Sequence, residues 1–169
     1  MKKRGFEIIT DYREKEIHLP QRATHHSAGY DFEAAEEVVI PSIWKQFLTR
    51  KINDNATTEK KIKPVLVPTG IKAYMMDDEF LQLANRSSNP LKRFLLVSNG
   101  VGVIDSDYYN NTENEGHIMF QFSNFGLKDV VIKKGERIGQ GIFLPFLKAD
   151  EDQTIHDRTG GLGSSDQEN

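Results

Sequence analysis

The chain has 169 residues, a formal net charge of −3 and a pI near 6.0, so it lacks the basic excess typical of proteins that bind nucleic-acid polymers. It contains no cysteine, which excludes disulfides, thiol catalysis and cysteine-ligated metals. Hydrophobic residues make up 37% of the chain, enough for the core of one domain, but no apolar run is long enough to span a membrane. The first residues do not resemble a signal peptide, so we expect a soluble, cytoplasmic protein.

Most of the chain shows the pattern of short β-strands. Runs rich in Val, Ile, Phe and Tyr recur between Gly, Pro, Asn and Asp residues. Many short strands at this spacing predict an all-β sandwich or barrel, and on this pattern alone such a fold is commonly a binding module without catalysis. The predicted strands are residues 6–10, 30–34, 38–40, 65–74, 80–83, 94–97, 101–104, 117–123, 130–132 and 141–146.

Two segments depart from the β pattern. In residues 42–52, apolar side chains recur at helical spacing after Ser42, a residue type that caps helices, so we predict an amphipathic helix inside an insertion. The lysines of the polar loop that follows are more typical of a solvated face than of a binding patch. From Ala149 the chain is acidic and then rich in glycine and serine, which is typical of a disordered terminus.

Two aspartates, Asp105 and Asp107, interrupt an apolar strand pattern. The preceding Asn99-Gly100 pair predicts a β-hairpin, because glycine tolerates the positive φ that a tight turn needs. Alternation then places Val103, Asp105 and Asp107 on one face of the strand. A carboxylate among apolar neighbours is costly to bury without a partner. These residues leave two interpretations open: Asp105 lies at the mouth of a pocket, or the aspartates simply end the strand.

Two further segments contain groups suited to an anionic ligand. Arg86 precedes two serines, and Ser88 would cap a short helix with Pro90 in its first turn, although such caps are also common in ordinary turns. Arg137 and Gln140 follow a glycine turn, and local evidence favours a role in satisfying loop carbonyls over contact with a ligand.

The tail and a histidine pair complete the set of candidate sites. The tail segment RTGGLGSS exposes backbone N–H groups that could wrap a phosphate chain, but it lacks the strand and helix of a P-loop. His25 and His26 have no third ligand at a zinc spacing, so we predict that both are surface residues.

The order of these segments resembles the homotrimeric deoxyuridine triphosphate nucleotidohydrolase (dUTPase) family. The family's five motifs are matched in order by SAGYDFEA, NRSS, SNGVGVIDSDYY, GERIGQGIF and RTGGLGSS, over nearly the whole chain. The resemblance implies a dUTPase-like β-barrel of jelly-roll type, with one inserted helix and a short helix after the second motif. It divides the chain into a β domain of residues 1–148, with an insertion at about 42–64, and a flexible C-terminal arm of residues 149–169 that closes over an active site.

The resemblance also implies a reaction. It is the hydrolysis of dUTP to dUMP and pyrophosphate by attack of water on the α-phosphorus, with Mg²⁺ as cofactor. Asp105 falls on the catalytic aspartate that orients the water, and Asp31 would act on the metal through a water molecule. Asn99 and Tyr108 fall on positions that contact the uracil and the deoxyribose. The other substrate-binding positions are Arg86, Ser87, Ser88, Gly102, Val103, Ile104, Gln140, Arg158, Leu162, Gly163, Ser164 and Ser165.

The chain departs from the family pattern in two ways. Leu162 stands nearest to the position of a phenylalanine that stacks on the uracil, and leucine has no π-face. Either closure of the arm is weaker, or another aromatic residue, such as Phe94, covers the base. The insertions at residues 42–64 and 110–115 resemble those of some Gram-positive bacteria and their phages, and could contact partners.

Two alternatives to dUTP hydrolysis stay open. The dCTP deaminases share the fold and several motifs, but they carry a glutamate base where Gln121 stands here, so deamination is disfavoured. Some phage members of the family bind a repressor, and the insertions would then contact this regulatory protein partner. The resemblance itself implies dUTP and further copies of the chain as partners, in a homotrimer with shared active sites, and no nucleic-acid polymer or membrane.

Overall fold

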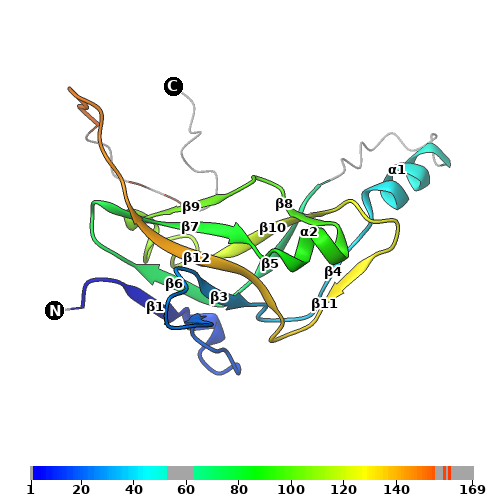
Figure 1. The fold of residues 1–169 in the computed structure, drawn as a ribbon, viewed down its shortest axis with the longest axis horizontal. Helices are drawn as coiled ribbons and strands as arrows, with labels where there is room; N and C mark the ends of the chain where they lie inside the picture. The colour runs from blue at the N-terminus through cyan, green and yellow to red at the C-terminus, as the bar shows by residue number, and fades with distance from the viewer. Residues whose placement is uncertain (1, 53–62, 155–157, 159, 161–169) are drawn as a thin grey trace.

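The computed structural model describes residues 2–52, 63–154, 158 and 160, and within them the chain is predominantly β-structure (Figure 1). The strands are β1 (Gly5–Ile8), β2 (Gln21–Arg22), β3 (Tyr30–Glu33), β4 (Val38–Ile40), β5 (Val65–Pro68), β6 (Ile71–Tyr74), β7 (Glu79–Asn85), β8 (Leu95–Val97), β9 (Gly102–Asp105), β10 (Met119–Asn124), β11 (Val130–Ile132) and β12 (Arg137–Pro145). The helices are α1 (Ile43–Ile52) and α2 (Ser88–Arg93), with short 3-10 turns η1 (Thr10–Tyr12) and η2 (Ser106–Tyr108). None of the described helices is long and apolar enough to cross a membrane.

The strands form four antiparallel sheets. The largest has the strand order β2-β3-β12-β7-β9, a second has the order β5-β10-β8, and β1-β6 and β11-β4 form two-stranded ribbons. Helix α1 lies at one end of the long axis, and the N-terminal β1 lies at the other (Figure 1). The predicted all-β, jelly-roll-type fold with one inserted helix and a short helix after Arg86 is therefore confirmed.

One hydrophobic core joins the sheets. Burial alternates along β10, and its inward side chains Phe120 and Phe122 are almost fully buried with Phe32 from β3 and Leu81 from β7. The rings of Phe32 and Phe120 lie 5.7 Å apart, between their centroids. A Cβ atom at Gly139 would lie 2.0 Å from the Phe120 ring, so β12 requires glycine there. Glycine weakens a strand pattern in the sequence, but at position 139 it is what allows β12 to pack over the core.

Most predicted strands are present. Two predictions about the strands were wrong, and a third wrong prediction concerns the start of a helix. Residues 65–74 form two strands, β5 and β6, because Gly70 adopts a φ of 71° between them. The Asn99-Gly100 turn forms, with Gly100 at a φ of 73°, but it does not close a hairpin: β8 pairs with β10, whereas β9 pairs with β7 in another sheet. The two-residue strand β2 was not predicted.

The third error concerns the start of α2. Ser87, not Ser88, holds the N-cap position, and its side chain makes no capping hydrogen bond. Helix α1 does begin after Ser42, whose Oγ accepts a 3.5 Å hydrogen bond from the Lys45 N–H. The polar loop predicted after α1 and most of the predicted arm lie outside the described residues.

Candidate functional site

Candidate phosphate-binding residues gather at one end of the five-stranded sheet. Asp31 on β3 is in register with Gln140 on β12, and Gln140 is in register with Ala84 on β7, two residues before Arg86. Arg137 begins β12 on the same side. We call Asp31, Arg86, Arg137 and Gln140 the basic end, because two guanidinium groups there face one carboxylate.

The side chains of the basic end are linked to one another. Arg137 Nη1 donates a 3.1 Å hydrogen bond to Asp31 Oδ2, and Arg86 Nε lies 3.9 Å from Asp31 Oδ1. Arg86 Nη1 also donates to the Arg137 carbonyl oxygen at 3.0 Å. It is therefore Arg86 that satisfies a carbonyl here, while the Arg137 side chain pairs with Asp31. The net positive charge suits a phosphate, which guanidinium groups bind well.

Glycine in the first motif makes room for Gln140. A Cβ atom on Gly29 would lie 2.1 Å from Gln140 Oε1 and 3.1 Å from Gln140 Cβ. Because Gln140 Cδ would also lie 2.9 Å away, a side chain at position 29 would require the Gln140 side chain to move. The motifs SAGYDFEA and GERIGQGIF, which are far apart in the chain, are therefore in contact through Gly29 and Gln140.

Residues around α2 show what sequence reasoning missed. Ser87 is exposed, and neither it nor Ser88 makes a side-chain cap that would occupy its hydroxyl. Asn89 anchors the helix instead: it is buried, and its Nδ2 donates to Asn85 Oδ1 and to the Ile138 carbonyl oxygen, each at 2.8 Å. Asn85 lies four residues before Asn89, but Ile138 is brought to Asn89 only by the fold, so the local sequence does not reveal this anchor.

The second group of candidates lies where β9 ends. Asp105 is the last residue of β9, and its side chain is 50% exposed. Val103 and Asp105 are both exposed, as the predicted alternation requires, whereas Asp107 is exposed but lies in η2, beyond the end of the strand. Arg158 Nη2 donates to Asp105 Oδ2 at 2.6 Å, and Arg158 Nε donates to Asp107 Oδ1 at 2.8 Å. The bond to Asp107 is the main reason that the pKa of Arg158 is raised, and the charge of Asp105 adds to it.

Tyr108 lies beside this acidic pair in η2. Its side chain is buried, which raises the pKa of the phenol, so the hydroxyl stays protonated. The hydroxyl donates to the His117 carbonyl oxygen at 3.1 Å and accepts from Asn114 Nδ2 at 2.9 Å. The Arg158 guanidinium carbon lies 5.6 Å from the centre of the Tyr108 ring. We call Asp105, Asp107, Tyr108 and Arg158 the acidic end.

The remaining candidates from the β8–β9 turn and the tail are distributed as follows. Asn99 and Val103 are exposed, Gly102 is buried and Ile104 is half-buried. Phe94, the possible cover for the base, is 61% exposed at the end of α2. The predictions for Leu162, Gly163, Ser164 and Ser165 lie outside the described residues.

The basic and acidic ends are far apart in one chain. Asp105 is in register with Phe80 on β7, whereas Arg86 follows Asn85 at the other end of that strand. Five residues of extended strand span about 17 Å. Register along β12 gives the same answer, since Phe80 faces Leu144 while Ala84 faces Gln140. A single chain thus presents two separate groups of candidate residues, which we call the two half-sites.

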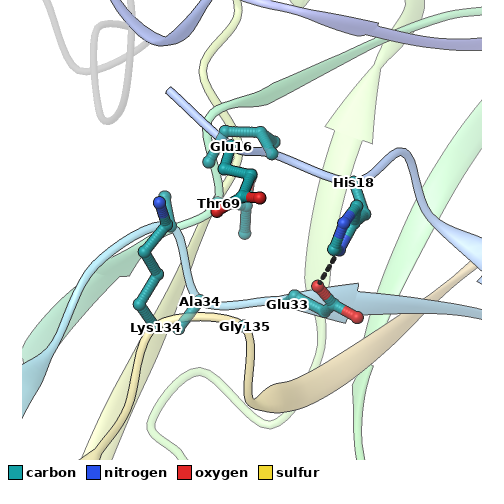
Figure 2. Close-up of a pocket in the computed structure, with 9 residues that line it drawn as sticks. Glu16, His18, Glu33, Ala34, Thr69, Lys134 and Gly135 are labelled. Atoms are coloured by element: carbon teal, nitrogen blue, oxygen red, sulfur yellow. Dashed lines mark hydrogen bonds and ion pairs between the residues drawn. The ribbon is translucent and has the colours of Figure 1, made fainter. Parts of the chain in front are cut away.

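A pocket away from both groups of residues is shown in Figure 2. Its volume is about 180 Å³. His18 Nδ1 and Glu33 Oε2 lie 3.0 Å apart at its edge. The pocket is smaller than the roughly 300–1,000 Å³ of typical small-molecule sites, and it contains none of the predicted site residues. Its lining residues are Glu16, Ile17, His18, Glu33, Ala34, Ala35, Thr69, Lys134 and Gly135.

Among the described residues, no group of three or more His, Cys, Asp or Glu side chains could enclose a metal ion. His25 and His26 are both exposed, as predicted. Asp31 is already paired with Arg137. A metal that fits these residues is one that keeps its waters and relies on a ligand's phosphates, as Mg²⁺ usually does.

Comparisons with known proteins agree with one another. The dUTPase family model matches residues 51–166. A deoxyuridine 5'-triphosphate nucleotidohydrolase from Lactococcus lactis is 50% identical over 167 residues, covering 98% of this chain and 99% of that protein. The crystal structure of dUTPase from Streptococcus mutans is similar with a TM-score of 0.71 at 47% identity, covering 86% of this chain and 98% of that chain.

A more distant structure shares the fold alone. A dUTPase mutant from phage phi11 of S. aureus is 15% identical, with a TM-score of 0.65, and covers 92% of this chain and 98% of that chain. Its structure is described as revealing how a structural Mg(II) ion is coordinated.

Proposed function

The chain belongs to the dUTPase family and is a dUTP diphosphatase, which hydrolyses dUTP to dUMP and pyrophosphate. We propose that Asp105 directs the attacking water and that more than one copy of the chain contributes to each active site. The exposure of Asp105 at the end of β9 supports its part in this proposal. The separation of the two half-sites supports the second part.

Asp105 acts on water as a general base. An exposed carboxylate at a strand end can accept a proton from water as that water attacks the α-phosphorus. General-base catalysis of this kind contributes roughly 10²–10⁴-fold. The leaving group is pyrophosphate, so the remaining barrier is lowered by groups that neutralise the triphosphate.

The basic end binds the triphosphate. Arg86, Ser87, Ser88 and Gln140 contact phosphate oxygens, with the two serine hydroxyls as donors. Fixed positive groups stabilise charge that develops on the phosphates during the reaction. Mg²⁺, when bound, supplies further neutralisation of the phosphates, and Asp31 would hold it indirectly through a metal-bound water. The existing pairing of Asp31 with Arg137 favours this indirect role over direct ligation.

The β8–β9 turn binds the nucleoside. Asn99 and the backbone of residues 102–104 contact the uracil, and the Tyr108 ring packs under the deoxyribose, leaving no room for a 2′-hydroxyl. Arg158 stands over that ring and bonds to Asp105, so it must move when nucleotide enters. It then contacts the phosphates with the rest of the arm, where Gly163, Ser164 and Ser165 supply donors and Leu162 covers the base.

The site is shared between copies in a homotrimer. Asp105 on β9 lies beside Phe80 near the start of β7, and Arg86 follows the end of β7, so one chain does not present both groups to one nucleotide. Closed ring symmetry repeats one head-to-tail interface, so each copy supplies its acidic end to a neighbour's basic end. Three copies make three equivalent sites.

The comparisons favour hydrolysis over both alternatives, because the curated relatives at high coverage are named as dUTP nucleotidohydrolases. Gln121 on β10 has an amide in place of the carboxylate that deamination needs. Trp44, Phe47 and Leu48 on α1 are each about half-exposed, but no contact among the described residues favours a regulatory protein as their partner.

The Asp105→Asn variant tests the role of Asp105. We expect pyrophosphate release from dUTP with Mg²⁺ to fall roughly 10²–10⁴-fold, while dUTP binding is retained because the amide keeps the size of the side chain. Pyrophosphate assays and calorimetric titration with dUTP measure the two quantities. Asp77→Asn, at an exposed aspartate outside both half-sites, is the matched control. Unchanged turnover in Asp105→Asn would remove Asp105 from this role.

A further inference from the structure

The loop between η2 and β10 is held in place by hydrogen bonds within the loop and to Tyr108. It turns through three residues with positive φ: Asn110, Glu115 and Gly116. The Asn110 N–H donates to the Glu115 carbonyl oxygen, and the Glu115 N–H donates to the Asn111 carbonyl oxygen, each at 3.1 Å. A Cβ atom on Gly116 would lie 2.6 Å from the Tyr108 carbonyl oxygen, so the loop closes tightly against Tyr108.

Asn114 is the loop residue that contacts the Tyr108 side chain. Its Nδ2 donates to the Tyr108 hydroxyl at 2.9 Å. Its Oδ1 accepts from Asn111 Nδ2 at 2.8 Å and from the Gly116 N–H at 3.0 Å, which fixes the orientation of the amide. The Tyr108 hydroxyl in turn donates to the His117 carbonyl oxygen. The phenol therefore has one donor and one acceptor, and both come from this loop region.

The loop is anchored outside the site as well. Lys72, a buried lysine on β6, donates to Asn110 Oδ1 at 2.5 Å and lies 3.3 Å from Glu115 Oε2. The Thr10 N–H donates to the same Glu115 oxygen at 3.2 Å. The Tyr109 hydroxyl donates to Glu7 Oε2 at 2.7 Å. Contacts to β1, η1 and β6 thus hold the loop in place against Tyr108.

We propose that Asn114 is a positioning residue for sugar selection: it fixes the depth of the Tyr108 ring beside Asp105 and thereby sets how strongly the enzyme prefers dUTP over UTP. This inference rests on the proposed role of Tyr108 at the deoxyribose. It gives the 110–115 insertion a function within the active site. Without the Asn114 donor, the phenol keeps only its hydrogen bond to the His117 carbonyl oxygen, so the ring is held less firmly and can shift to open space for a 2′-hydroxyl.

The test compares kcat/KM for dUTP with kcat/KM for UTP in Asn114→Ala, Tyr108→Phe and the double variant. Each single change should lower the dUTP preference by on the order of tenfold, the scale of one hydrogen bond. The double variant should lose no more than Tyr108→Phe alone, because the hydrogen bond between Asn114 and Tyr108 is already absent from that variant. Thr112→Ala, at an exposed position of the same loop, should keep the wild-type preference.

A merely structural role would slow dUTP and UTP alike and leave their ratio unchanged. An unchanged ratio in Asn114→Ala, or full additivity in the double variant, would overturn the inference. If Asn114→Ala did not fold, Asn114→Asp, which keeps the size but lacks the N–H donor, tests the same expectation. A wild-type protein without preference for dUTP would instead contradict the proposed role of Tyr108.

Discussion

At the scale of single residues, an exposed carboxylate and a buried histidine lie close to Tyr108 at the acidic end. Asp105 is exposed, but His117, whose carbonyl oxygen accepts the Tyr108 hydroxyl, is only 6% exposed. Its Nε2 accepts the Gly70 N–H at 2.9 Å, and its ring lies 5.3 Å from the Tyr12 ring. Burial lowers the pKa of His117 to about 4. The imidazole is therefore neutral at physiological pH and cannot gain a proton without losing the bond from Gly70.

This burial predicts a pH dependence of stability. Below pH 6.5 the unfolded chain protonates His117 while the folded chain does not, so the free energy of unfolding falls as the pH drops from 6.5 towards 4. The expected contribution is about 3 kcal/mol, since each pKa unit corresponds to about 1.4 kcal/mol. Urea denaturation of wild type and His117→Gln between pH 4 and 8 measures it. Parallel pH profiles for the two proteins would contradict the assignment to His117.

Predictions about single residues were correct where the pattern within one strand determines the direction of the side chain. Alternation along residues 102–105 correctly placed the Asp105 side chain outward. Asn89 was not identified, because its partner Ile138 is brought to it only by the fold. Asn114 was not identified either, although its partners lie within six residues of it, because the sequence alone does not give the conformation of this loop. Arg137 was noted, but its pairing with Asp31 depends on the register between β12 and β3.

Among the elements, α1 and α2 begin in different ways. Ser42 is fully buried before α1: its Oγ donates to the Gly126 carbonyl oxygen at 2.6 Å, and its N–H donates to Asp129 Oδ1 at 3.0 Å. Ser87 holds the corresponding position before α2 but makes no capping bond. The start of α1 is thus fastened to the segment before β11.

The different bonding of Ser42 and Ser87 predicts that their substitution lowers the free energy of unfolding by different amounts. Ser42→Ala leaves the Gly126 carbonyl oxygen without its partner, so we expect a loss of about 1–3 kcal/mol in the free energy of unfolding. Ser87→Ala removes no cap bond and should cost less than about 0.5 kcal/mol. Chemical denaturation of both variants, with the wild type, gives the comparison. Equal losses would show that the buried hydroxyl does not stabilise α1.

Element-scale prediction was good for strands bounded by turn residues and poor for their pairing. The strands at Val38–Ile40 and Val130–Ile132 have the predicted bounds. The Asn99-Gly100 turn is present, yet it joins two sheets rather than closing a hairpin. A turn signal fixes a local φ but does not determine which sheet the next strand enters.

At the scale of the whole molecule, strand order determines which candidate residues lie together in one chain. The five-stranded sheet places Asp31, Arg86 and Gln140 near one end and Asp105 near the other. Sequence motifs list these residues together but say nothing of this separation, because strand order and register are set by non-local pairing. The charges of the two ends are complementary, which suits their meeting across an interface between copies.

Subunit mixing tests the shared site most directly. Asp105→Asn and Arg86→Ala chains, each nearly inactive alone, are dissociated, mixed in equal amounts and reassembled, and pyrophosphate release from dUTP is measured. If Asp105 and Arg86 of one site come from different copies, random assembly of a symmetric ring restores about a quarter of wild-type activity. A reassembled mixture no more active than the two variants measured separately would contradict the account.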